Sequence, residues 1–157
     1  MNKKKIVISG ISIVVLAIAI ICTFHFDDQK TGELYPMPDK IIIYHEGSST
    51  EIKNTDDLFE QLYTINYIPE RKEILETSID PDGVEEIKSE LAVEYVYYEQ
   101  QNMKFEEIDR NYHKLLFVYS GWCENNVVFY EDEYQSGTIS NSTSKKAVEK
   151  IIARVDE

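Results

Sequence analysis

Apolar positions fall into one long block near the start of the chain and a series of shorter, patterned runs after it. The block is residues 6–26, IVISGISIVVLAIAIICTFHF, which carries no charged side chain and follows the basic start MNKKK. At ~1.5 Å per residue, about 20 helical residues cross a ~30 Å hydrocarbon layer. The pattern therefore predicts a transmembrane helix in residues 1–26, an extended tether in residues 27–39, and one domain in residues 40–157.

The charges that flank this block predict its orientation. The three lysines of MNKKK precede it and the acidic FDDQ follows it, so the N-terminus should stay cytoplasmic and the C-terminal domain should be extracytoplasmic. Two other fates stay open, namely cleavage at AIA (17–19) and lipidation of Cys22. Apolar residues continue past AIA, and the bulky Ile21 precedes Cys22. An uncleaved, single-pass anchor in the cell membrane is therefore the favoured interpretation.

Runs rich in Val, Ile and Tyr predict strands in the rest of the chain. Residues 41–45 and 51–53, separated by the turn-like EGSS, predict a hairpin. LAVEYVYYEQ (91–100) favours a strand, although its apolar residues also fit near-helical spacing. HKLLFVYSG, VVFYEDE and YQSGTIS predict three more strands, with WCENN as the turn between the first two.

Three runs predict helices. The capping residue is expected to be Asn54 or Thr55 in NTDDLFEQLYTI, Asp82 in DGVEEIKSEL, and Ser142 or Thr143 in NSTSKKAVEKIIARV. The stretch IPERKEILETSIDPDG stays open between a helical turn, a strand and a long connection. The whole pattern predicts an α+β fold, in which a transmembrane helix precedes a mainly antiparallel sheet with two or three helices packed on one face.

Charge narrows the class of partner. The only charged residues before residue 27 are three lysines, so the rest of the chain holds all 29 acidic residues and 13 of the 16 basic ones, a net charge of −16. Such a body repels phosphate backbones, so nucleic acid is not an expected partner, whereas basic peptides, cations or positively charged polymers are. High net charge also serves solubility alone.

Cys123 is the first candidate for chemistry. A nucleophilic cysteine needs a neighbouring histidine or a helix N-terminus to lower its pKa. Only His45 and His113 lie beyond the apolar block, and Glu124 beside the thiol disfavours a thiolate. We therefore predict that Cys123 is a small, half-buried residue next to Trp122, whose ring covers the end of the hairpin.

Motifs for metals and cofactors are weak or missing in the sequence. Asp80, Asp82 and Gly83 fit part of a calcium loop, but Ser89 stands where such a loop has its bidentate glutamate. The segment reads better as a turn that starts a helix, and the carboxylates of residues 131–133 as a solvated loop. The sequence has no glycine-rich phosphate loop, Ser-x-x-Lys, HExxH or CxxC motif. We therefore expect no metal and no cofactor.

The eleven tyrosines are candidates for ligand contacts. YVYY places Tyr95 and Tyr97 on one face of a strand and Tyr98 on the other. Aromatic rows stack on sugars or peptides, although they more often belong to a core. Tyr95, Tyr97 and Trp122 are the predicted ligand-binding residues, and no catalytic residue is predicted.

The segments PMPDKIIIYHEG and FVYSG…FYEDEYQSGTIS, over residues 37–155, resemble small membrane-anchored extracytoplasmic domains of low-GC Gram-positive bacteria. The resemblance implies no particular activity and no site residue. The expected function is a non-enzymatic binding module of the bacterial cell envelope, whose partner is an envelope protein, a peptide or a cell-wall component. The alternative is an envelope hydrolase or thiol enzyme that uses Cys123 with His45 or His113.

Overall fold

The structure, a computed structural model, describes residues 33–68, 74–75, 79–105, 108–135, 138–141 and 143–154. The predicted transmembrane block, the AIA sequence and Cys22 lie outside these residues. Within the described ranges, no helix combines the length and the apolar character needed to cross a bilayer.

Strands make up most of the described chain. In chain order the elements are β1 (Glu33–Leu34), β2 (Lys40–His45), β3 (Ser48–Lys53), α2 (Asp57–Ile65), β4 (Tyr67–Ile68), β5 (Ile74–Leu75), α3 (Pro81–Ser89), β6 (Ala92–Phe105), β7 (Ile108–Val118), β8 (Asn126–Tyr130), β9 (Thr138–Ser140) and α4 (Lys145–Ile152). The predicted strands of the C-terminal third and the strand after residue 91 are confirmed. The open stretch, residues 68–83, contains the last residue of β4, the short β5 and the start of α3.

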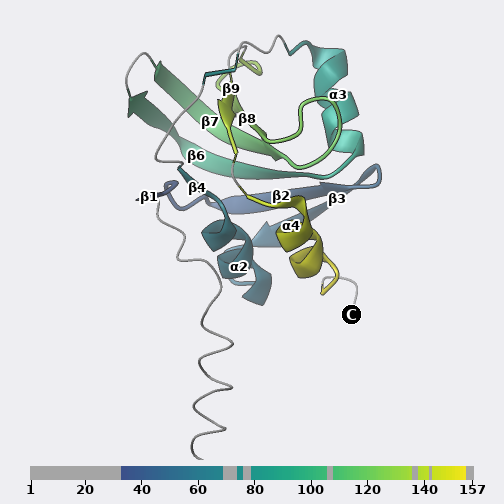
Figure 1. The fold of residues 1–157 in the computed structure, drawn as a ribbon. Helices are drawn as coiled ribbons and strands as arrows, with labels where there is room; N and C mark the ends of the chain where they lie inside the picture. Colours follow the sequence, from purple (N-terminus) through teal and green to yellow (C-terminus); the bar gives the residue numbers. More distant parts are fainter. Residues whose placement is uncertain are drawn as a thin grey trace, which may run out of the picture. The chain divides into compact units, whose positions relative to one another are not determined.

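Seven of these strands form one antiparallel sheet in the order β3-β2-β6-β7-β8-β9-β5 (Figure 1). The predicted β2–β3 hairpin is confirmed, and Glu46 and Gly47 close it with positive φ angles of 51° and 74°. Two successive residues with positive φ form a type I′ turn, whose twist matches that of the flanking strands. Strands β6 to β9 then follow one another across the sheet, and β1 pairs separately with β4.

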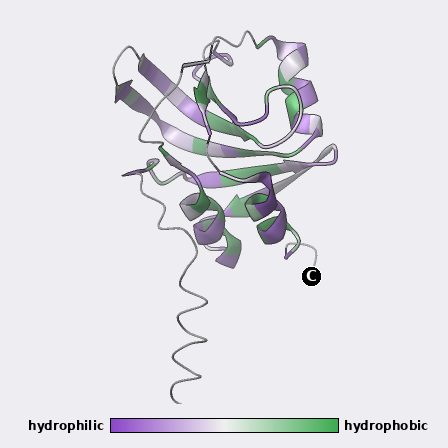
Figure 2. Ribbon diagram, in the orientation of Figure 1, coloured by the Kyte–Doolittle hydropathy of each residue, from purple (hydrophilic) through white to green (hydrophobic). Residues whose placement is uncertain are grey.

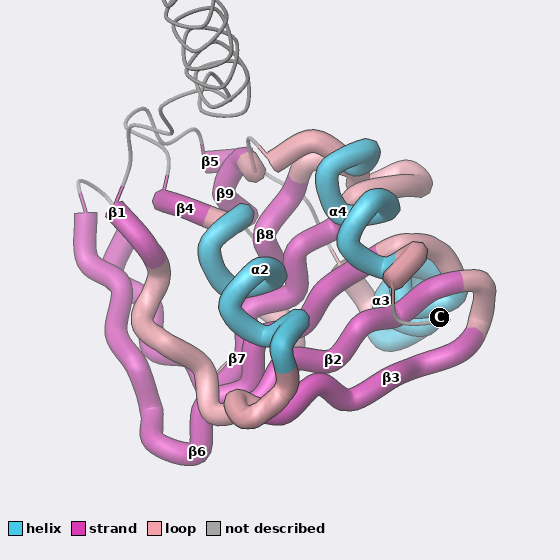
Figure 3. Tube along the Cα trace, turned by 90° about the horizontal axis from the view of Figure 1, so that it is seen from below, coloured by secondary structure: helices cyan, strands magenta, loops and turns pink. Residues whose placement is uncertain are grey.

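The three helices lie on both faces of the sheet, as Figures 1 and 3 show from two directions. Helices α2 and α4 contact each other on one face, and α3 lies on the opposite face. The prediction of helices on one face is therefore wrong. The reason lies in β7, where Leu115 and Phe117 face the α2–α4 side while Leu116 and Val118 face α3. A strand that is apolar on both sides needs cover on both sides.

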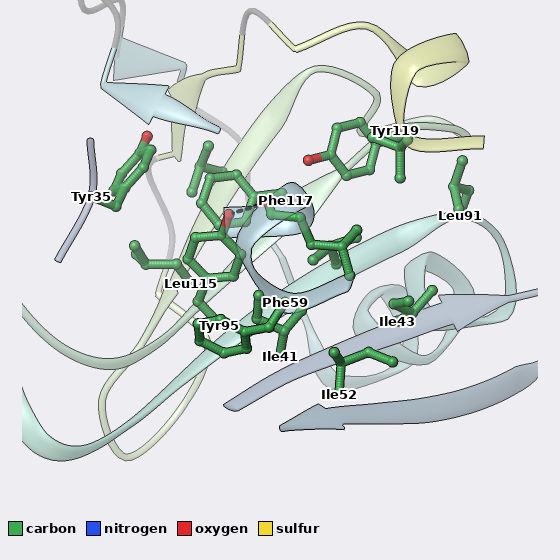
Figure 4. Packing of buried hydrophobic residues seen from close by; sticks show 14 of the residues in the cluster. Tyr35, Ile41, Ile43, Ile52, Phe59, Leu91, Tyr95, Leu115, Phe117 and Tyr119 are labelled. Carbon is green, nitrogen blue, oxygen red and sulfur yellow. Dashed lines mark hydrogen bonds between the residues drawn. The ribbon is translucent and has the colours of Figure 1, made fainter. Parts of the chain in front are cut away.

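The core on the α2–α4 side is large and aromatic (Figure 4). The Phe117 ring lies 4.6 Å from the Tyr95 ring and 5.1 Å from the Tyr35 ring, measured between centroids. Helix α2 adds Phe59 and Leu62, which are both buried. Figure 2 shows hydrophilic residues toward the free end of the β6–β7 hairpin, which extends beyond this core.

The folded domain starts earlier than residue 40. Tyr35 is buried in the larger core, and its carbonyl oxygen accepts a hydrogen bond from the Tyr63 hydroxyl at 3.0 Å. The Tyr97 hydroxyl donates to the carbonyl of Pro36, also at 3.0 Å. From Glu33 onward, the segment predicted to be a tether therefore belongs to the domain, because burial of the Tyr35 ring and these two hydrogen bonds fix it to the core.

Helix α3 starts two residues before the predicted position. Its N-cap is Asp80, whose Oδ1 accepts a hydrogen bond from the backbone N–H of Gly83 at 2.8 Å. Pro81 stands at the first helical position, where its missing N–H costs nothing. The prediction that this acidic segment is a turn opening a helix is confirmed, although Asp82 is not the cap.

The caps of α2 and α4 also differ from prediction. Asp56 and Ser144 are the N-cap residues, and neither side chain makes a capping hydrogen bond. The hydroxyl of Thr143 instead donates to the carbonyl of Ile65 at 2.6 Å. This hydrogen bond links the start of α4 to the end of α2. A capping rule considers only neighbouring residues, so it cannot predict such a long-range contact.

Candidate functional site

One carboxylate lies in the interior of the domain, on the α3 side of the sheet. Glu94 of β6 is only 1% exposed. The Tyr44 hydroxyl donates to its Oε2 at 3.0 Å, and the Tyr134 hydroxyl donates to its Oε1 at 2.5 Å. Lys88 Nζ lies 3.8 Å from the same Oε1. A buried charge of this kind requires such partners, because water no longer solvates it.

The two tyrosines also surround the lysine. Lys88 Nζ lies 5.0 Å from the ring centroid of Tyr44 and 5.0 Å from that of Tyr134, within cation–π range. We call Tyr44, Lys88, Glu94 and Tyr134 the Lys88 cage. Its members come from β2, α3, β6 and the segment after β8, so the cage joins α3 to the sheet.

The two tyrosine hydroxyls of the cage lose their protons only at high pH. Burial, and then the charge of Glu94, raise the pKa of the Tyr44 hydroxyl and the pKa of the Tyr134 hydroxyl well above their usual range. Both phenols therefore stay protonated and act as donors at neutral pH. Each carboxylate oxygen of Glu94 has a donor, so this arrangement stabilises α3 and does not present a general base to a substrate.

Two hollows flank the cage. The first, which we call the aromatic hollow, has a volume of about 280 Å³ and is lined by Ile79, Asp80, Pro81, Val84, Glu85, Tyr130, Glu133 and Tyr134. The second has a volume of about 350 Å³ and is lined by Tyr44, Gly47, Ser48, Ser49, Glu85, Lys88 and Ser89. Glu85 borders both of them. A larger hollow of about 380 Å³, beside residues 109–111 and 131–133, is lined by polar and charged residues only.

The aromatic hollow combines an apolar lining with acidic residues. The rings of Tyr130 and Tyr134 meet edge to face with their centroids 4.9 Å apart. Glu85 and Glu133 are exposed, as the prediction of a solvated loop over residues 131–133 implies for Glu133. Lys114 Nζ lies 4.5 Å from the centroid of Tyr130, a second cation held on an aromatic ring of this region. Apolar surface beside a few charged groups is typical of a ligand site.

The predicted ligand-binding tyrosines belong to the larger core. Tyr95 and Tyr97 are buried, whereas Tyr98 points to the other side and is 73% exposed. The Tyr95 hydroxyl donates to the carbonyl of Leu62 at 2.7 Å and accepts from Asn66 Nδ2 at 3.0 Å. The hydroxyls of Tyr95 and Tyr97 therefore bind other parts of the domain on the α2 side and do not form a ligand-binding surface.

Trp122 has a different environment from the two tyrosines. It is 50% exposed and lies near the start of α3. A Cβ placed on Gly83 would come within 3.2 Å of its Cζ2 atom, so the ring packs closely against that glycine. The structure therefore does not bring Trp122 together with Tyr95 and Tyr97 on one surface.

Cys123 is buried in the smaller core on the α3 side, which contains Ile79, Val84, Ile87, Ala92, Leu116, Val118, Cys123 and Val128. Cys123 is thus more deeply buried than the predicted half, since only 1% of the residue is exposed. Burial raises the pKa of the thiol to about 11. His45 is exposed at the end of β2, and no hydrogen bond from the thiol to it or to His113 occurs among the described residues.

Metal ligation has no support in the described part of the chain. No group of three or more His, Cys, Asp or Glu residues suited to a metal ion occurs there. The acidic residues at 80–83 serve the start of α3, where Asp80 caps the helix.

The Lys88 cage cannot be predicted from local sequence pattern. Its one visible signal is Glu94, a charged residue inside the apolar run LAVEYV. Its partners stand far away in the sequence, Tyr44 by 50 residues and Tyr134 by 40. A charged residue in such a run indicates either an exposed position or a buried ion pair, and only the fold decides between them.

Comparison with known proteins gives no match: no protein-family model, curated protein or solved structure matches the chain.

Proposed function

We propose that the protein is a membrane-anchored, extracytoplasmic binding module of the bacterial cell envelope, and that the α3 side of its sheet is the binding face. The observation that carries this proposal is the aromatic hollow, where an apolar lining meets exposed carboxylates beside a cage that fixes α3 in place. The apolar block of residues 6–26 and its flanking charges support the membrane anchor.

Binding fits the chemistry of this face better than catalysis does. A thiol enzyme needs a thiolate that substrate can reach, whereas Cys123 is buried and its pKa is raised to about 11. A hydrolase needs a nucleophile or general base in contact with its substrate. Glu94 is the buried carboxylate of this face, and its oxygens are occupied by two tyrosines and a lysine.

Site-specific photocrosslinking in living cells tests the proposal. A photoreactive residue would replace Glu85 or Glu133, at the aromatic hollow, in the full-length protein. Matched controls would replace Glu60 in α2 or Glu149 in α4, which are exposed on the opposite side of the sheet. We expect discrete adducts from the first pair only, with an envelope protein, a peptide or a wall fragment. Adducts from the control pair alone, or equally from all four positions, would contradict the proposed binding face.

The same cells test the topology. Protease added to intact protoplasts should remove a C-terminal tag and leave a small membrane-bound fragment. A protected tag would reverse the proposed orientation.

A further inference from the structure

The aromatic hollow fits one kind of side chain in particular. Ile79, Pro81 and Val84 supply aliphatic surface, and Tyr130 and Tyr134 supply aromatic surface. Its volume of about 280 Å³ suits a side chain and not a folded domain. Lysine and arginine bury an apolar stem against such surface while their charged heads stay at the water boundary.

The negative charge around the aromatic hollow disfavours binding of an anion. Three carboxylates line it, those of Asp80, Glu85 and Glu133. Asp80 Oδ1 already accepts the N–H of Gly83 as the cap of α3, whereas Glu85 and Glu133 are exposed and carry no comparable capping role. The chain beyond residue 26 adds a net charge of −16, which attracts cations over a longer range.

The protein already holds lysine side chains in the same way. Lys88 lies between the rings of Tyr44 and Tyr134 and beside the carboxylate of Glu94. Lys114 lies over the ring of Tyr130. Two of these rings, Tyr130 and Tyr134, also line the aromatic hollow, so the chemistry that would hold a foreign cation is present at that position.

We propose that the aromatic hollow binds an arginine or lysine side chain of a partner peptide, an inference that rests on the proposed function. The stem of that side chain lies against Ile79, Val84 and the tyrosine rings, and its cationic head pairs with Glu85 and Glu133. Arginine binds more tightly than lysine, because its planar guanidinium contacts two carboxylates and stacks on aromatic rings.

Fluorescence anisotropy with defined peptides tests this inference on the full chain in a non-ionic detergent. The probes are labelled Gly-Ser-Arg-Val-Arg-Ser-Gly and its versions with lysine or glutamate in place of arginine. We expect the arginine peptide to bind most tightly, the lysine peptide more weakly, and the glutamate peptide at least about tenfold more weakly than arginine.

Matched variants separate a defined site from general attraction by the acidic surface. Glu85→Gln and Glu133→Gln should each weaken the arginine peptide by about two- to fivefold, and the double variant by about tenfold. Glu60→Gln and Glu149→Gln remove the same charge from the opposite side and should leave its affinity within about 1.5-fold, since long-range effects are screened by salt. All four substitutions are at exposed positions, so folding should be preserved.

Three results would overturn the inference: equal binding of the glutamate peptide, equal losses from the control variants, or tighter binding of a glucosamine oligomer than of the arginine peptide. If Glu85 and Glu133 still crosslink to a partner in cells while the peptides show no preference for positive charge, the proposed binding face stands and the cationic ligand is wrong. If crosslinking also fails at both positions, the proposed function fails with it.

Discussion

The two faces of the sheet bury polar groups with different kinds of partner. On the α2–α4 side, Asn66 is fully buried, accepts from the Tyr119 hydroxyl at 2.6 Å and donates to the Tyr95 hydroxyl at 3.0 Å. All of these groups are neutral. On the α3 side, the buried group is the carboxylate of Glu94, and its cation is Lys88. The α2–α4 side therefore buries its central polar group with neutral hydrogen bonds, and the α3 side does so with an ion pair.

This difference indicates which face of the sheet is better suited to bind another molecule. The neutral hydrogen bonds of Asn66 with Tyr95 and Tyr119 are satisfied inside the core and leave none of these groups to a partner. Lys88 keeps 18% of its side chain exposed, so the ionic cage reaches the surface. A hollow of about 340 Å³ beside β1 also combines apolar surface with Glu33 and Lys104, so the two faces differ mainly in the buried ionic cage, which only the α3 side has among the described residues.

High pH should unfold the domain, and mainly through the α2–α4 side. Burial raises the pKa of five tyrosines in that core, Tyr35, Tyr95, Tyr97, Tyr112 and Tyr119, with Tyr112 at about 12. The unfolded chain loses these protons near pH 10. Because the folded state keeps them, stability is fully present below that pH and is lost as the pH rises above it, by up to ~1.4 kcal/mol per group and pH unit.

Circular dichroism between pH 8 and 12 measures this loss on a fragment of residues 27–157, which contains every described element. The Tyr119→Phe variant removes one such group and should show a shallower decline above pH 10. A domain as stable at pH 11.5 as at pH 8 would contradict the burial of these hydroxyls.

Neighbouring residues of β7 compare the two cores directly. Phe117 faces the larger core and Leu116 the smaller one, and both are fully buried. We expect Phe117→Ala to cost ~3–5 kcal/mol of unfolding free energy and Leu116→Ala ~2–3 kcal/mol, because the phenylalanine ring buries more apolar surface than the leucine side chain. Urea unfolding measures both, and a greater loss from Leu116→Ala would contradict this ranking of the cores.

Removing the central polar group of each face should cost more on the α3 side. Glu94→Ala leaves the buried part of Lys88 and two tyrosine hydroxyls without their carboxylate, at a cost of about 3 kcal/mol. Asn66→Ala leaves the Tyr119 hydroxyl without its acceptor, at ~1–2 kcal/mol, since Tyr95 keeps the carbonyl of Leu62. Glu94→Gln should lie between the two. Equal losses in urea unfolding would mean that the ion pair adds nothing beyond its hydrogen bonds.

The smallest effect should come from Cys123. With a pKa of about 11, only about one thiol in a thousand is ionised at pH 8. Alkylation of the folded fragment should therefore be slow and should accelerate on denaturation, while Cys123→Ala should cost on the order of 1 kcal/mol. Fast alkylation of the folded fragment down to pH 6 would instead indicate a thiolate paired with a cation.

Much of this fold could be predicted from local pattern. Alternating and β-branched residues located the β2–β3 hairpin and strands β6 to β9, and the acidic residues after Asp80 located the start of α3 to within two positions. These signals are local, because strand period, turn chemistry and helix capping depend on neighbours in the sequence.

The remaining features depend on contacts between distant residues. The run LLFV in β7 does not reveal that helices cover both of its sides, and the segment around Tyr35 resembles a tether until its ring is seen in the core. Glu94 alone gives no sign of Lys88 or of the two tyrosines. The candidate site was missed for this reason, while Tyr95 and Tyr97, chosen for their pattern, are core residues.

We propose one division of roles between the two faces: the α3 side binds the partner, and the α2–α4 side is the scaffold. Its most direct test is a ¹⁵N-labelled fragment of residues 27–157 titrated with Gly-Ser-Arg-Val-Arg-Ser-Gly and followed by backbone amide chemical shifts. We expect the largest shift changes in α3 and in residues 130–134, and changes near zero in α2 and α4. Changes concentrated in α2 and α4, or absent throughout at millimolar peptide, would contradict the claim.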